Sequence, residues 1–177
     1  GYTLPNATLA YKTHGTLNAA RDNADVKALV YVAGLAPDSG ESTPDLLGKY
    51  PGATLGEHLY EVPLSDGTAD VYVHQNAYHQ HFCADLSAEQ ASLHAATQRP
   101  FNTAALNEPS GEPAWASIPS WFVYPELDLA IPAQTFRFMA QRAGARSTVE
   151  VPGASHALPA SQPAAVADVI LQAAASV

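Results

Sequence analysis

Residues 118–132, IPSWFVYPELDLAIP, place an apolar run directly before a polar turn and a proline. The run at 120–124 predicts a strand, and Pro132 is placed to open a helix at its first turn. A second strand is predicted at 148–151, with the histidine of GASH just behind it at His156. Strands that alternate with helices in this order indicate a parallel α/β sheet.

The pattern extends in both directions from this stretch. Residues 26–33, VKALVYVA, form a continuous apolar and β-branched run, which is typical of a strand buried on both faces of a parallel sheet. At the other end, Ser161 is the predicted N-cap of a last helix with one apolar face. The sequence therefore predicts a single α/β domain over residues 1–177.

Residues 51–113 have a different character, because apolar residues are sparser and His and Gln are frequent, and the predicted lid covers about 37–113. We expect one short strand at 69–74 and helices at 76–84 and 88–98, the second preceded by a capping box that starts at Ser87. This segment is predicted to be a helical lid inserted on the sheet.

Composition excludes several classes of protein. The 177 residues carry a net charge of −9, and 47% are hydrophobic but only 14% charged, which excludes a disordered tail. A chain with eight scattered Lys and Arg residues has no basic stripe for nucleic acid or an anionic membrane surface. The single cysteine, Cys83, fits a reducing compartment, so we expect a soluble, cytoplasmic protein without membrane contact.

Two candidate catalytic side chains follow consecutive predicted strands. Asp128 lies shortly after the strand at 120–124, and His156 shortly after the strand at 148–151. The carboxyl ends of parallel strands meet at one edge of the sheet, where ligands bind. An Asp that accepts a hydrogen bond from a His ring fixes its tautomer for general-base catalysis. The alternative is that Asp128 caps the next helix and that His156 is an ordinary loop histidine.

Residues 26–177 resemble the C-terminal portion of an α/β-hydrolase-fold protein. The likeness rests on VKALVYVAGLAPDSGES, ATQRP, ALNEPSG, IPSWFVYPELDLAIP and VEVPGASHALPASQP, which follow in the expected order. Residues 1–25 resemble the N-terminus of homoserine O-acetyltransferase-like members of the same fold. The resemblance implies a parallel-sheet fold reduced in strand number, with Asp128 as the acid of a triad and His156 as its base. Glu126 is a lesser candidate for the acid.

The nucleophile elbow of that family, G-x-S-x-G, does not occur in the 177 residues. The family's order of serine, acid and histidine therefore has only its last two members here. Ser39, which follows the strand at 26–33, is the candidate for an unconventional nucleophile. The alternative is that Asp38-Ser39-Gly40 is a turn and that Ser42 caps the next helix.

Other candidate sites are weaker. His74, His79 and His81 cluster within eight residues, but a His-x-His pair on a helix projects its rings in different directions, and no Cys pair or HExxH accompanies them. Cys83 is expected to be a buried thiol. We therefore expect neither a metal nor a cofactor.

Two classes of function remain open. The first is a hydrolase of carboxylic esters or similar small acyl substrates, which would use the His156–Asp128 pair with an unconventional or missing serine. The second is a non-catalytic α/β-hydrolase remnant that binds a small molecule, or a half-enzyme completed by another chain. Open sheet edges invite pairing, so a homo-oligomer is predicted.

Overall fold

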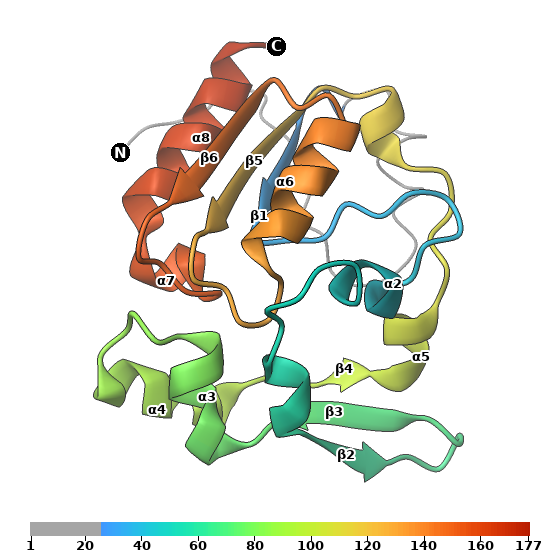
Figure 1. Ribbon diagram of the computed structural model, residues 1–177, viewed down its shortest axis with the longest axis vertical. Helices are drawn as coiled ribbons and strands as arrows, with labels where there is room; N and C mark the ends of the chain where they lie inside the picture. Colours follow the sequence, from blue (N-terminus) through green and yellow to red (C-terminus); the bar gives the residue numbers. More distant parts are fainter. Residues whose placement is uncertain (1–25) are drawn as a thin grey trace.

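The computed structural model describes residues 26–177, and its centre is a parallel sheet of three strands (Figure 1). The strands are β1 (Leu29–Val32), β5 (Ser120–Pro125) and β6 (Ser147–Val151), in the order β1-β5-β6. The predicted parallel sheet is thus confirmed. The alternating sequence at 9–13 also predicts a strand, and His14-Gly15 a turn, but both lie outside the described residues.

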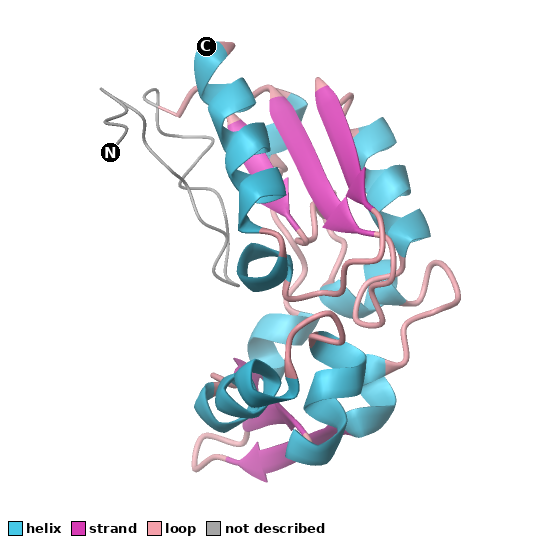
Figure 2. Cartoon of the chain, turned by 90° about the vertical axis from the view of Figure 1, so that its left-hand side faces the viewer, coloured by secondary structure: helices cyan, strands magenta, loops and turns pink. Residues whose placement is uncertain are grey.

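Two helices cover the faces of this sheet. Figure 2 shows the sheet between α8 (Pro163–Ala175) on one side and α6 (Ala133–Arg142) on the other. Phe136 and Met139 of α6 are fully buried, and Val166 and Val169 of α8 are nearly so. Helix packing on both faces explains why every residue of β5 is buried and why β5 reads as a continuous apolar run.

The long connection from β1 to β5, which we name the inserted segment (residues 33–119), holds a second sheet. Strands β2 (Leu59–Pro63), β3 (Ala69–Val73) and β4 (Phe101–Asn102) pair antiparallel in the order β2-β3-β4. Gly67, with φ of +86°, supplies the left-handed residue of the β2–β3 turn. Sequence analysis found only β3, because all five residues of β2 are exposed and give no buried pattern.

The inserted segment also contains the predicted helices. The Ser87 hydroxyl accepts a hydrogen bond from the Gln90 amide, and the Gln90 side chain accepts one from the Ser87 amide, so the capping box is confirmed. The helical elements of this segment are α2 (Thr43–Leu47), η1 (Leu55–His58), α3 (Gln75–Phe82), α4 (Ala88–Thr97), α5 (Thr103–Asn107) and η2 (Ala114–Ala116).

The predicted cap of the last helix is wrong. Ser161 is the final residue of a short helix, α7 (Leu158–Ser161), and the N-cap of α8 is Gln162. Pro163 follows as the first residue of α8, a position that proline favours because its missing N–H is not needed there. The last helix therefore begins one residue later than the sequence predicts, directly after a short helix that was not predicted.

The largest buried cluster lies between the parallel sheet and its helices. Its fully buried side chains include Trp121, Phe122, Phe136 and Leu46. A second cluster joins the inserted segment to Ala157 and contains Tyr78 and Cys83, so the thiol is buried as expected. Among residues 26–177, no helix has both the length and the apolar character needed to cross a bilayer.

Candidate active site

The carboxyl ends of β5 and β6 bring together the acid and the base that the sequence singled out. Nδ1 of His156 lies 2.7 Å from Oδ2 of Asp128, although the two residues are 28 positions apart. An ionised carboxylate can only accept, so this contact assigns the proton to Nδ1 and leaves Nε2 of a neutral ring as an acceptor. Two of the predicted site residues are therefore in contact.

The Asp128 side chain is held on both of its oxygens. Its Oδ1 accepts hydrogen bonds from the backbone amides of Ala130 (2.7 Å) and Ile131 (2.9 Å), in the turn that leads to α6. Asp128 is only 4% exposed. Asp128 thus holds the turn before α6 and also binds His156, whereas the N-cap of α6 is Pro132, so the interpretation of Asp128 as the cap of that helix is wrong. The carboxylate has little freedom to leave the imidazole.

The loops that follow β5 and β6 are joined to each other. The Glu126 amide donates to the Val151 carbonyl at 3.0 Å, and the Leu127 amide donates to the Ala154 carbonyl at 3.0 Å. The Gly153 amide donates to Oε2 of Glu126 at 2.9 Å. Glu126, the lesser candidate for the acid, therefore holds the backbone of the His156 loop, while Asp128 holds the ring.

The imidazole of His156 remains accessible on its other side. The side chain is 20% exposed, and its Nε2 makes no hydrogen bond to residues 26–177. Phe82, the last residue of α3, presents its ring to the His156 ring in a T-shaped contact with centroids 4.8 Å apart. An oriented ring with one free acceptor nitrogen can take a proton from a hydroxyl or a water placed beside it.

The inserted segment holds the His156 loop at two further points. The amide of Ala157 donates to the carbonyl of Phe82 at 3.1 Å. The hydroxyl of Ser155 donates a hydrogen bond to Oδ1 of Asp85. These contacts flank His156 on both sides along the chain, so the end of α3 and the turn after it help to position His156.

Asp85 was missed by sequence analysis. Its pKa is raised by burial, but hydrogen bonding from Ser155 and the nearby Ser161 hydroxyl outweighs burial and leaves the pKa below its usual value. Oδ2 of Asp85 and Oγ of Ser161 are buried without a well-formed hydrogen bond. Asp85 lies 70 positions before Ser155. No short-range pattern joins them, so only the fold reveals the contact.

Ser39 lies in a different network from His156. Its exposed turn is fixed by the Gly40 amide, which donates to the Ser110 carbonyl at 2.8 Å, and by the Asp38 carboxylate, which accepts from the Ser39 amide. Two residues on, Glu41 binds the guanidinium of Arg142 at 2.8 Å. Arg142 ends α6, whereas Asp128 lies before its start, so the hydrogen bonds attach the Ser39 turn to the far end of that helix.

The histidines of the inserted segment are not arranged as a metal centre. Nε2 of His79 lies 2.9 Å from the Leu86 carbonyl, whereas Nδ1 of His81 lies 3.2 Å from the Thr54 hydroxyl. The two rings therefore contact different parts of the chain, as the His-x-His spacing on a helix predicts. Within residues 26–177, no group of three His, Cys, Asp or Glu side chains has the geometry to hold a metal ion.

Solved structures with a similar fold are enzymes of larger size. Polyneuridine aldehyde esterase superposes with a TM-score of 0.67 at 16% identity, over 84% of this chain and 62% of the other. Methylesterase MES16 from Arabidopsis gives 0.69 at 12% identity, over 92% and 65%. A pyrethroid hydrolase from Sphingobium faniae JZ-2 gives 0.63 at 18% identity, over 89% and 64%. The chain thus spans less than two thirds of these structures.

The low identities show a shared fold and no more. A comparison with curated proteins found no match. A family model described as the alpha/beta hydrolase family matches residues 8–169, which is most of the chain. With its parallel sheet and the His156–Asp128 contact at the carboxyl ends of β5 and β6, this chain belongs to the alpha/beta hydrolase family.

Proposed function

We propose that this chain supplies the base and the orienting acid for the hydrolysis of carboxylic esters or similar small acyl substrates. The observation that carries the proposal is the 2.7 Å contact between His156 Nδ1 and a buried carboxylate of Asp128. Membership of a hydrolase family supports the class of reaction. That the bond cleaved is a carboxylic ester is our more specific proposal.

In the proposed mechanism, His156 acts as general base and then as general acid. Nε2 removes the proton from the attacking oxygen as that oxygen adds to the acyl carbon. The proton then passes from Nε2 to the leaving alkoxide when the tetrahedral intermediate collapses. Asp128 keeps Nδ1 protonated throughout and stabilises the imidazolium that exists between the two transfers. General acid–base catalysis of this kind contributes about 10²- to 10⁴-fold in rate.

The nucleophile is the second part of the proposal. We retain Ser39 as the serine to be tested first, because it is the candidate from the sequence that follows the carboxyl end of β1. The Ser39 turn is attached to the Arg142 end of α6, however, and this favours a different nucleophile: a water molecule that His156 activates directly. Water attack forms no covalent acyl intermediate, so that reaction would be slower than a two-step serine reaction.

The surroundings of His156 suit an apolar acyl group. Phe82 lies against the His156 ring, and Tyr78 lies against Phe82 with ring centroids 4.8 Å apart. Aromatic walls with few polar groups are common in pockets that bind small apolar ligands. We therefore expect esters with an apolar acyl group to be better substrates than esters with a charged one.

A fluorophosphonate probe combined with ester hydrolysis tests the proposal. We expect hydrolysis of p-nitrophenyl acetate to fall about 10²-fold in His156→Gln and to be unchanged in His94→Gln, a histidine with no contact to the pair. If Ser39 is the nucleophile, mass spectrometry will find the adduct on Ser39 and His156→Gln will abolish it. Hydrolysis without an adduct supports water attack.

One result would contradict the proposal that His156 is the base of a hydrolase. If wild type and His156→Gln hydrolyse the ester at the same rate and neither forms an adduct, the chain is not a hydrolase by this mechanism. That outcome would favour the non-catalytic binding module.

We also propose that the chain assembles with a second copy. Within the described sheet, β1 and β6 each pair with β5 alone, so each has an outer edge. Unpaired strand edges are the usual route to pairing between chains. Size-exclusion chromatography with light scattering is expected to give a dimer at micromolar concentration, and a stable monomer would contradict the proposal.

A further inference from the structure

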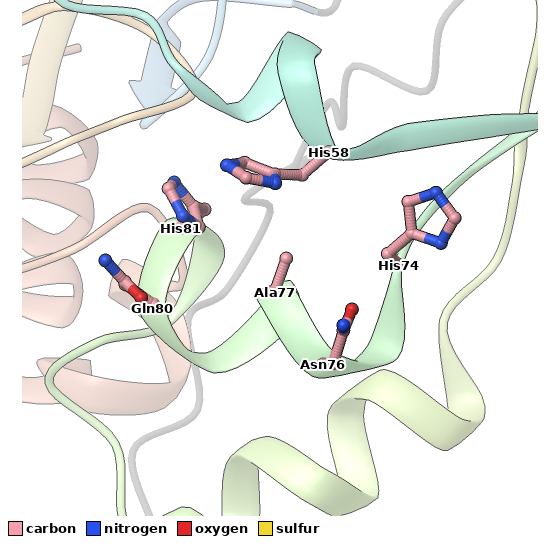
Figure 3. A pocket seen from close by; sticks show the side chains of 6 residues that line it. All are labelled: His58, His74, Asn76, Ala77, Gln80 and His81. Carbon is pink, nitrogen blue, oxygen red and sulfur yellow. The ribbon is translucent and has the colours of Figure 1, made fainter.

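A pocket whose lining includes neither His156 nor Asp128 is rich in imidazole. It has a volume of about 360 Å³ and lies between η1, the end of β3 and α3 (Figure 3). Its lining residues are His58, His74, Asn76, Ala77, Gln80 and His81. Three of the six lining side chains are therefore imidazoles, and two more carry amides.

Two of the imidazoles stack on each other. The rings of His58 and His81 have centroids 3.8 Å apart and are tilted by 38°, and they face one another in Figure 3. Burial and the charge of His58 lower the pKa of His81, while the carboxylate of Glu57 raises it to a smaller extent. A negative group beside the two rings would favour their charged forms.

The third histidine closes the other side of the pocket. His74 is the N-cap residue of α3, and its ring packs against the Tyr60 ring of β2 with centroids 4.9 Å apart. Asn76 and Ala77 follow in the first turn of α3, where the helix dipole favours a negative group, although the Ala77 amide already donates to the His74 carbonyl. Among residues 26–177, no carboxylate lines the pocket, although the Glu57 carboxylate is close enough to act on His81.

The arrangement does not suit a single metal ion. The three imidazoles form no ligand group that could converge on one cation within the part of the chain that the structure describes. A ligand that reaches His58, His81 and His74 must instead present several acceptor atoms across the pocket. Phosphate and carboxylate groups do so with oxygens that imidazolium and amide N–H groups can donate to.

We propose that this pocket binds a small oxyanion, of the phosphate or carboxylate type, between the His58–His81 pair and His74. The amides of Asn76 and Gln80 supply further donors. Because the ligand stabilises the charged imidazoles, binding takes up protons, and affinity rises as the pH falls from about 7.5 to 5.5. The proposal does not depend on ester hydrolysis, since none of these residues belongs to the His156–Asp128 pair.

Histidine ring resonances of the intact chain, followed by NMR at pH 6, test the proposal. Inorganic phosphate is expected to shift the signals of His58, His81 and His74 along a saturable curve. His94, on α4, serves as the internal control and is expected not to respond. A parallel titration with sodium chloride at matched ionic strength separates binding from screening. Equal shifts at all histidines, or equal effects of the two salts, would overturn the proposal.

Variants and a second anion sharpen the result. His58→Asn and Gln80→Leu should each weaken phosphate binding, His58→Asn by about tenfold, whereas His94→Asn should not. Acetate in place of phosphate shows which oxyanion the pocket prefers. If neither anion binds, or if Zn²⁺ alone shifts these signals, the oxyanion site is wrong. If His58→Asn fails to fold, unchanged binding in Gln80→Leu is the contradicting result.

Discussion

The parallel sheet and the inserted segment differ in how deeply their strands are buried. All six residues of β5 are buried, whereas all five residues of β2 are exposed. The parallel sheet is sandwiched between α6 and α8, whereas the antiparallel sheet leaves Tyr60 and Val62 accessible. The first region therefore owes its stability to a shared core. The second depends more on local hydrogen bonds, caps and turns.

The comparison also separates two ways of supplying functional groups. The parallel sheet fixes Asp128 and His156 by its topology, since both follow strands that end at the same edge. The inserted segment adds side chains that reach the loops from outside, through Phe82 and Asp85. One region thus determines which groups meet, and the other limits how freely they move.

The largest expected effect comes from the core of the parallel sheet. Phe136 is fully buried and stacks on Tyr124 with ring centroids 5.0 Å apart. Phe136→Ala should lower the free energy of unfolding by about 3–5 kcal/mol, because it leaves a cavity against β5. Urea denaturation followed by circular dichroism measures the change. Tyr60→Ala in the antiparallel sheet is the matched aromatic control and should cost clearly less; equal losses would remove the contrast between the regions.

The next effect tests the contact between the regions. Asp85→Ala leaves the Ser155 hydroxyl, in a residue only 5% exposed, without its acceptor, and should lower the free energy of unfolding by about 1–3 kcal/mol. Asp168→Ala, in an exposed position of α8, is the control and should stay within about 0.5 kcal/mol. Equal effects of the two variants would show that the Asp85 contact does not hold the His156 loop.

The pH dependence of the same contact has a definite sign. The pKa of Asp85 is lowered in the folded chain, so its ionised form stabilises the fold above the unfolded pKa near 4. That stability is lost as the pH falls through the lower folded value. The difference in unfolding free energy between wild type and Asp85→Asn should therefore shrink below about pH 4. A difference that grows on acidification would contradict the lowered pKa.

A smaller effect is expected in the His156 loop itself. Gly153 has φ of +69°, and a Cβ added there would meet nothing within 4 Å, so Gly153→Ala should cost only backbone strain of about 1–2 kcal/mol. Gly56 is equally open but has no positive φ, which makes Gly56→Ala the matched control. Thermal unfolding compares them. Equal midpoints would mean that the loop relaxes around residue 153.

The smallest effect lies in the inserted segment. Ser87→Ala removes both the hydroxyl of the capping box and its bond to the Gln90 amide, at a cost of about 1 kcal/mol. Urea denaturation should show a small shift of the midpoint with an unchanged slope. Ser117→Ala, in the same segment but outside a capping box, is expected to shift it less, and the reverse order would contradict the role of the cap.

Much of the first region could be predicted from the sequence. The continuous apolar run of β5 predicted a strand buried on both faces, and the run at β1 predicted a strand that is only partly buried. The contact between Asp128 and His156 followed from the topology of parallel strands. The exposed strand β2 could not be predicted, because it carries no period of buried residues. Nor could Asp85, whose contact with Ser155 joins distant parts of the chain.

The tautomer of His156 tests the central claim most directly. Nitrogen-15 chemical shifts of the neutral ring report which nitrogen carries the proton, and we predict Nδ1–H with a free Nε2 in wild type. Asp128→Asn should weaken this preference, because its amide can also donate toward Nδ1. If His156 carries its proton on Nε2 in the wild-type chain, Asp128 does not orient a base, and the proposed mechanism is contradicted.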